Sequence, residues 1–128
     1  MRFLNIACGN TLIDNELWTN IDFTSTNKSV NRMNVLSKLP FNNGSFDVIY
    51  TSHFVEHIPK EDLSGFYKEC FRLLKPGGMI RIVMPDFEFL MKEYFFHIEN
   101  RDIDKLEFVS LLIFATNHFG KYLNLLRK

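Results

Sequence analysis

Short apolar runs alternate with amphipathic stretches along the chain, a pattern typical of a parallel sheet covered by helices. Five of these runs predict strands, at residues 3–8, 18–23, 29–34, 46–50 and 79–84. The run at 29–34 is the weakest, because only Val30 and Met33 are apolar there. No repeat and no linker interrupts the sequence, so the pattern indicates one α/β domain.

The clearest helix is predicted at residues 59–74. Pro59 suits its first turn, and Pro76-Gly77-Gly78 is expected to end it and turn the chain into the last strand. Six apolar side chains recur at helical spacing and form one stripe directed at a sheet: Leu63, Phe66, Tyr67, Cys70, Leu73 and Leu74.

More helix is predicted after the last strand, where Asp86 can cap a helix. Its apolar stripe is predicted to be Phe87, Leu90, Met91, Tyr94, Phe95 and Ile98. Phe89 and Phe96 lie off that stripe, so we expect them to meet a partner or a second subunit. A further helix is predicted at 102–115, and residues 121–128 are expected to begin another.

The chain has 128 residues, and its 15 basic and 15 acidic residues give a net charge of zero. A neutral chain exerts no long-range attraction on phosphate backbones, so no nucleic acid partner is expected. No segment resembles a signal peptide, and the longest apolar run, at 108–115, is too short to cross a membrane. We therefore expect a cytoplasmic protein with reduced, buried thiols at Cys8 and Cys70 and no membrane partner.

The strongest candidate for chemistry is the turn at Gly9, directly after the first predicted strand. It does not match the G-x-G-x-x-G fingerprint, so a nicotinamide cofactor is not supported. Asp22 ends the second predicted strand, where a carboxylate can accept both hydroxyls of a ribose. Together the two residues predict a nucleoside site whose attached group lies over the turn. An ordinary glycine turn and a solvated aspartate are the alternatives.

Several short motifs surround this turn, and their order and spacing are more specific than any one of them. They are LNIACGN at residues 4–10, WTNID at 18–22, LPF at 39–41, NGSFD at 43–47, VEH at 55–57, LKPGG at 74–78 and VMPD at 83–86. This succession resembles the class I S-adenosylmethionine-dependent methyltransferases, most closely their small bacterial, type 11-like branch. The resemblance covers about residues 3–90.

The resemblance implies a Rossmann-like three-layer α/β fold with a mostly parallel sheet in the strand order 3-2-1-4-5. Residues 1–128 would form a single domain, with the nucleotide-binding sheet and helices in 1–86 and a helical segment in 87–128. The family's usual strands 6 and 7 have no counterpart in this sequence, so it resembles a truncated member with strand 5 at an edge. Dimerisation through that strand or the Phe-rich helices would cover the edge, which leaves a homodimer open.

The resemblance also implies S-adenosylmethionine as the cofactor, S-adenosylhomocysteine as the product and a small-molecule acceptor that the sequence does not identify. By the family pattern, Asp22 would hold the ribose and Phe23 would lie beside the adenine. The other residues carried over are Asn5, Ala7, Gly9 and Asn10 at the methionine end, Asn34, Val35 and Leu36 at the adenine edge, and Ser52 near the reactive methyl.

The reaction implied by the family is an in-line displacement, in which a nucleophilic atom of the acceptor attacks the methyl group. Alignment carries much of such a reaction, and a base is needed only when the acceptor must lose a proton. His53, beside the reactive methyl, is the candidate base, and Asp86 is the candidate for orienting the acceptor.

Departures from the family pattern support a second hypothesis. Asn5 replaces the usual acidic residue, Ala7 and Thr11 replace glycines, and Asn34 stands where aspartate is common. A domain with these changes could keep the fold and act as a binding or interaction module without turnover.

A third hypothesis comes from residues 53–57, which fit the zinc-protease pattern H-x-x-E-H. On a helix, His53 and His57 would share a face and bind zinc, with Glu56 as the base. Because Pro59 interrupts any long helix directly afterwards, a zinc hydrolase is the least supported of the three.

Overall fold

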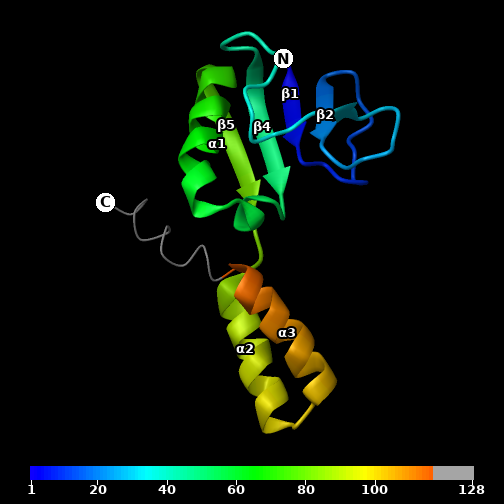
Figure 1. Ribbon diagram of the computed structural model, residues 1–128, viewed down its shortest axis with the longest axis vertical. Helices are drawn as coiled ribbons and strands as arrows, with labels where there is room; N and C mark the ends of the chain where they lie inside the picture. Colours follow the sequence, from blue (N-terminus) through cyan, green and yellow to red (C-terminus); the bar gives the residue numbers. More distant parts are fainter. Residues whose placement is uncertain (117–128) are drawn as a thin grey trace. The chain divides into compact units, whose positions relative to one another are not determined.

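The computed structural model describes residues 1–116, with side chains for residues 1–109. The chain divides into two compact units, and the first, Met1–Val83, contains a five-stranded sheet in the order β3-β2-β1-β4-β5 (Figure 1). All neighbouring strands are parallel, which confirms the expected order. The strands are β1 (Phe3–Ile6), β2 (Trp18–Asp22), β3 (Asn31–Arg32), β4 (Phe46–Ser52) and β5 (Leu74–Val83).

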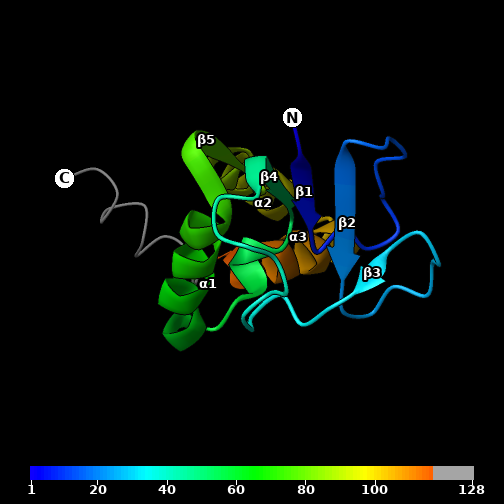
Figure 2. The ribbon, with the colours of Figure 1, turned by 90° about the horizontal axis from the view of Figure 1, so that it is seen from above.

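Helix α1 (Lys60–Leu73) and the 3-10 turn η1 (Val55–His57) lie on the same side of this sheet (Figure 2). The buried side chains of α1 are Leu63, Phe66, Cys70 and Leu73, all members of the stripe predicted from the sequence. They pack against the sheet together with Leu4, Ile6 and Ile49 of β1 and β4, each no more than 1% exposed. These buried side chains form the apolar core of the first unit, in which α1 contacts β5.

The start of β5 differs from the prediction. The strand begins at Leu74, directly after α1, and Pro76-Gly77-Gly78 lies within it instead of forming a separate turn. The ladder with β4 shifts here, since Phe46 pairs with Leu74 and Val48 with Met79. Such a bulge places extra residues opposite one partner and uses glycine at positive φ; Gly77 has a φ of 77°.

Gly78 is the bulge residue for which substitution is most costly. A Cβ added there would lie 3.0 Å from the carbonyl oxygens of both Asp47 and Lys75, which are backbone atoms that cannot step aside. We expect Gly78→Ala to lower the free energy of unfolding by about 1–3 kcal/mol, measured by urea denaturation.

Gly65 in α1 provides the matched control, because a Cβ added there meets no atom within 4 Å. Gly65→Ala should raise the free energy of unfolding by about 0.5–1 kcal/mol, as expected for an unhindered helical glycine. Equal effects of the two substitutions would contradict the close approach at Gly78.

The second unit begins at Met84 and contains the helices α2 (Phe87–Glu99) and α3 (Ile103–Thr116). Asp86 caps α2 as predicted, with Oδ1 accepting from the amides of Glu88 at 3.0 Å and Phe89 at 3.2 Å. The apolar stripe predicted for α2 is only partly right. Leu90 is buried, but three of its members are exposed: Phe87, Phe95 and Ile98.

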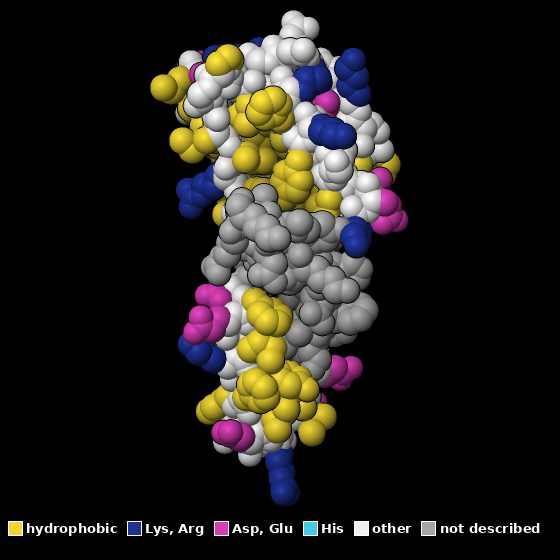
Figure 3. Space-filling view, turned by 90° about the vertical axis from the view of Figure 1, so that its left-hand side faces the viewer, with side chains coloured by type: hydrophobic (Ala, Val, Ile, Leu, Met, Phe, Trp, Pro, Cys, Tyr) yellow, Lys and Arg dark blue, Asp and Glu magenta, His cyan; other side chains and the backbone are white. Residues whose placement is uncertain are grey.

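The buried position that the pattern missed is His97, whose imidazole Nε2 lies 3.5 Å from Glu93 Oε2 and whose Nδ1 lies 3.7 Å from Asp102 Oδ2. Phe89 and Phe96 are exposed, and Figure 3 shows hydrophobic side chains gathered on one face of this helical unit. The homodimer stays a prediction, which size-exclusion chromatography with light scattering would test.

Cys8 and Cys70 are free and buried, as predicted. The helices in the described part of the chain are each too short or too polar to span a bilayer. The predicted helix at 121–128 lies outside the described residues.

Candidate functional site

The structure brings the Gly9 turn and Asp22 into direct contact at the carboxyl ends of β1 and β2. The amide of Gly9 donates to Asp22 Oδ2 at 2.9 Å. The other oxygen, Oδ1, accepts from the amides of Thr24 at 2.7 Å and Ser25 at 2.9 Å, and from the Thr24 hydroxyl at 3.0 Å. Asp22 thus ties the turn after β1 to the loop after β2.

These hydrogen bonds favour the ionised form of the Asp22 carboxyl group. Burial, with 7% of the residue exposed, raises the pKa of Asp22, but the hydrogen bonds from Gly9, Thr24 and Ser25 outweigh it and leave the pKa below its ordinary value. Burial and the nearby Asp22 charge together raise the pKa of the Cys8 thiol. The site therefore holds one carboxylate and a protonated, unreactive thiol.

The backbone of the turn leaves room for a ligand. Ala7 and Gly9 both have a φ of 54°, the left-handed region that favours glycine. A Cβ added at Gly9 would meet no atom within 4 Å, so space lies open beside the turn. Asp22 Oδ2 accepts one hydrogen bond within the described part of the chain and keeps a lone pair for a further donor. An open turn beside an acceptor carboxylate fits a nucleoside with an attached chain.

Two buried amides hold the turn in place. Asn5 Nδ2 donates to Asn20 Oδ1 at 2.9 Å and to the Thr11 carbonyl at 3.4 Å. Asn20 in turn donates to the carbonyl of Ile13 and accepts from its amide. Both amide hydrogens of Asn5, predicted to face a cofactor, are thus used inside the protein. Asn20 was missed by the sequence analysis, because only the register of β1 and β2 in the structure places it opposite Asn5.

The residues predicted to meet an adenine differ in exposure. Phe23 is 57% exposed, and Arg32 holds its position with Nε donating to the Phe23 carbonyl at 2.9 Å. The amide of Met33 donates to the backbone carbonyl of Asp22, so the loop that follows β3 begins beside the end of β2. Leu36 in this loop is exposed, with its amide bound to Asn34 Oδ1, whereas Val35 is buried in the core. Phe23 and Leu36 therefore offer apolar surface to a ligand, and Val35 does not.

The third group of predicted residues lies at the end of β4. Thr51 is in register with Ile6, so Ser52 ends β4 and His53 follows it at the same edge where the Gly9 turn follows β1. His53 lies outside η1, so it and His57 do not share a helix as the zinc pattern requires. Asp86 belongs to the second unit, where it caps α2.

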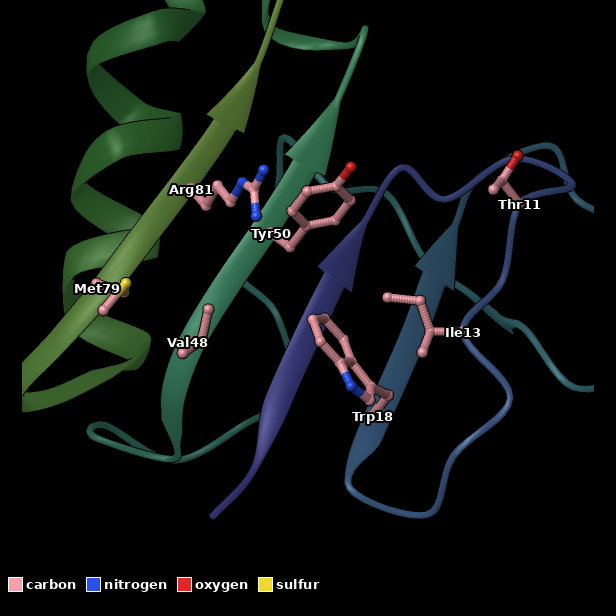
Figure 4. A pocket seen from close by; sticks show the side chains of 7 residues that line it. All are labelled: Thr11, Ile13, Trp18, Val48, Tyr50, Met79 and Arg81. Atoms are coloured by element: carbon pink, nitrogen blue, oxygen red, sulfur yellow. The ribbon is translucent and has the colours of Figure 1, made fainter.

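A pocket of about 480 Å³ lies on the side of the sheet that faces away from α1 (Figure 4). The sequence analysis missed it, although strict alternation along β4 directs Val48 and Tyr50 to one face of the sheet and the buried Ile49 and Thr51 to the other. The rings of Trp18 and Tyr50 meet edge to face at 6.4 Å between centroids. The lining residues are Thr11, Ile13, Trp18, Val48, Tyr50, Met79 and Arg81.

Comparison with known proteins agrees with this geometry. The family described as a methyltransferase domain matches residues 4–82, more than half of the chain. Sterol 24-C-methyltransferase erg6 of Aspergillus fumigatus is 41% identical over 56 residues, which are 44% of this chain and 13% of that protein. Sterol 24-C-methyltransferase ERG6B of Gibberella zeae is 35% identical over 68 residues, 53% of this chain and 16% of that protein.

A third relative, from Mycolicibacterium smegmatis, is named "Probable S-adenosylmethionine-dependent methyltransferase". It is 37% identical over 51 residues, 40% of this chain and 19% of that protein. The matched segments thus span less than a fifth of each of these three relatives. The family match covers all five strands except the outermost residues of β1 and β5. The chain belongs to the methyltransferase domain family of class I, whose cofactor is S-adenosylmethionine.

Proposed function

We propose that this chain binds S-adenosylmethionine across the ends of β1 and β2 and transfers its methyl group to a small-molecule acceptor. The observation that carries the proposal is the contact between the Gly9 amide and the Asp22 carboxylate beside an open turn. It joins the two features that a nucleoside with a charged tail requires, a hydrogen-bond acceptor for the ribose and bare backbone for the attached chain.

The remaining residues have separate roles in this proposal. Asp22 accepts a ribose hydroxyl on Oδ2, the exposed ring of Phe23 lies against the adenine, and Asn10 in the turn contacts the methionine end. Ala7, Asn34 and Leu36 shape the walls of the site, and the buried Val35 supports their loop from the core. Asn5 acts through the turn that it holds. The bound cofactor supplies an electrophilic methyl group on a sulfonium with a good leaving group.

The residues of the chain itself align the acceptor with the methyl group and provide a base for the proton that the acceptor loses. Ser52 ends β4 and His53 follows it, at the edge where the methyl group would lie, and the His53 side chain is 61% exposed. An acceptor that must lose a proton gives it to the imidazole of His53. Asp86 caps α2 in the second unit and has no role in this proposal.

The acceptor is proposed only as a small molecule. Two of the relatives are named as sterol methyltransferases, but the matched segments are 13% and 16% of their lengths. Their acceptor is therefore not carried over to this chain.

Isothermal titration calorimetry with S-adenosylmethionine and S-adenosylhomocysteine tests the proposal. We expect both ligands to bind, and we expect Asp22→Asn to weaken binding at least tenfold, about 1.4 kcal/mol, because the charge-assisted bond to the ribose is lost. Asp14→Asn removes the same charge from an exposed position in the neighbouring loop and should leave the affinity unchanged. No heat with either ligand at high concentration would instead favour a binding module without turnover.

A further inference from the structure

We propose that Glu56 is a positioning residue for His53. Its carboxylate holds the imidazole in the tautomer that carries the proton on Nδ1, so Nε2 is the free proton acceptor at the carboxyl edge of the sheet. The inference rests on the proposed function, because it assigns a partner to the base named there.

The two side chains lie in contact but in different surroundings. His53 Nδ1 lies 3.6 Å from Glu56 Oε1. The Glu56 side chain is 3% exposed, whereas the His53 side chain is 61% exposed. The carboxylate is thus fixed in the protein interior, and the imidazole extends from it toward solvent.

One carboxylate oxygen of Glu56 lacks a hydrogen-bond donor. Its Oε2 is buried and has no hydrogen-bond partner within the described part of the chain. A buried carboxylate without donors is costly, so such a group in a folded protein requires an explanation. His53 Nδ1 lies beside the other oxygen, Oε1, so a proton on Nδ1 places a donor next to the same carboxylate group, although not on Oε2.

The backbone brings the two residues together. His53 has a φ of 51°, unusual for a residue other than glycine, and its amide donates to the carbonyl of Val83 at 2.9 Å. The chain then enters η1, which begins at Val55 and contains Glu56, so the two side chains meet across the turn that leads into η1. Strained backbone of this kind persists where surrounding structure holds it, and it is concentrated at functional sites.

The chemical consequence follows from the two nitrogens of imidazole. In the neutral ring one nitrogen donates and the other accepts, and the hydrogen bond at one decides the state of the other. With the proton on Nδ1, Nε2 has a free lone pair. As the acceptor forms its bond to the methyl carbon, the carbon–sulfur bond would break and leave S-adenosylhomocysteine as a neutral thioether. The proton that the acceptor loses would move to Nε2 of His53, and the resulting imidazolium would be paired with the Glu56 carboxylate.

Long-range ¹H–¹⁵N NMR on the full chain reads the tautomer directly and needs neither cofactor nor acceptor. We expect His53 of the unmodified protein to carry its proton on Nδ1. Glu56→Leu removes the acceptor and should shift the ratio of the two tautomers at least tenfold toward the Nε2-protonated form. His97, in the second unit, should keep its signals.

A His53 proton on Nε2 in the unmodified protein, or a ratio unchanged in folded Glu56→Leu, would overturn the proposal. If Glu56→Leu does not fold, the spectrum of the unmodified protein decides alone. A purely structural role for Glu56 would not move the tautomer. Calorimetry with S-adenosylhomocysteine separates the two proposals, since absent binding refutes the proposed function and leaves the tautomer result intact.

Discussion

Asp22→Ala is expected to lower the free energy of unfolding by about 3–5 kcal/mol, because removing a buried charged acceptor leaves its donors without partners. The amides of Gly9, Thr24 and Ser25 all donate to this carboxylate. These amides belong to the turn after β1 and the loop after β2, so both segments should become more mobile in the variant. Urea denaturation at neutral pH measures the loss.

The same experiment has a matched control and a pH dependence. Asp14→Ala, at an exposed loop position, should change the free energy of unfolding by no more than about 0.5 kcal/mol. Since the pKa of folded Asp22 is lowered, its contribution is complete above the unfolded pKa of about 3.9 and is lost as the pH falls through the folded pKa. The difference between the native protein and Asp22→Ala should therefore shrink in acid. A difference that is independent of pH would contradict the hydrogen-bonded carboxylate.

Arg72→Lys is expected to lower the free energy of unfolding by about 2–3 kcal/mol, because an ammonium cannot replace a guanidinium that binds several acceptors at fixed angles. Arg72 Nη1 donates to the Phe41 carbonyl at 2.8 Å and to Asn43 Oδ1 at 2.9 Å, and Nη2 donates to the Leu39 carbonyl at 3.1 Å. Nη2 also lies 2.6 Å from Glu69 Oε1. This one side chain therefore fastens the segment before β4 to α1.

Thermal and urea unfolding measure this loss of stability, and an exposed ion pair provides the control. Lys92 and Glu88 form an i, i+4 pair in α2 whose side chains are largely exposed, so Lys92→Ala should have no measurable effect. The side-chain hydrogen bond from Arg72 is the main cause that lowers the pKa of Glu69, so Arg72→Lys should move that pKa back toward its ordinary value. An unchanged Glu69 pKa would contradict the described contact.

Periodicity and the family resemblance together predict most of the sheet and α1. The apolar stripe of residues 59–74 identified the buried face of α1, since helical spacing places those side chains together. The start of β5 could not be predicted in this way. Pro76-Gly77-Gly78 is typical of a turn, and only the pairing with β4 shows that it forms a bulge within a strand.

The sequence predicts the site residues that lie at the ends of strands. It does not predict which side chains of the site pair with one another. Gly9 and Asp22 follow from the parallel strands that precede them, and the structure places them in contact. The buried amide pair of Asn5 and Asn20 depends on strand register, which local patterns do not determine. The pairing of Glu56 with His53 likewise depends on the backbone that enters η1.

Amide NMR with S-adenosylhomocysteine is the most direct test that a nucleoside binds across the ends of β1 and β2. At saturating ligand, the account predicts shift changes concentrated at the amides of Gly9, Asn10, Phe23 and Thr24. The amide of Gly65, in the interior of α1, should not move. Saturation that leaves Gly9 and Thr24 unmoved while amides elsewhere shift would contradict the account.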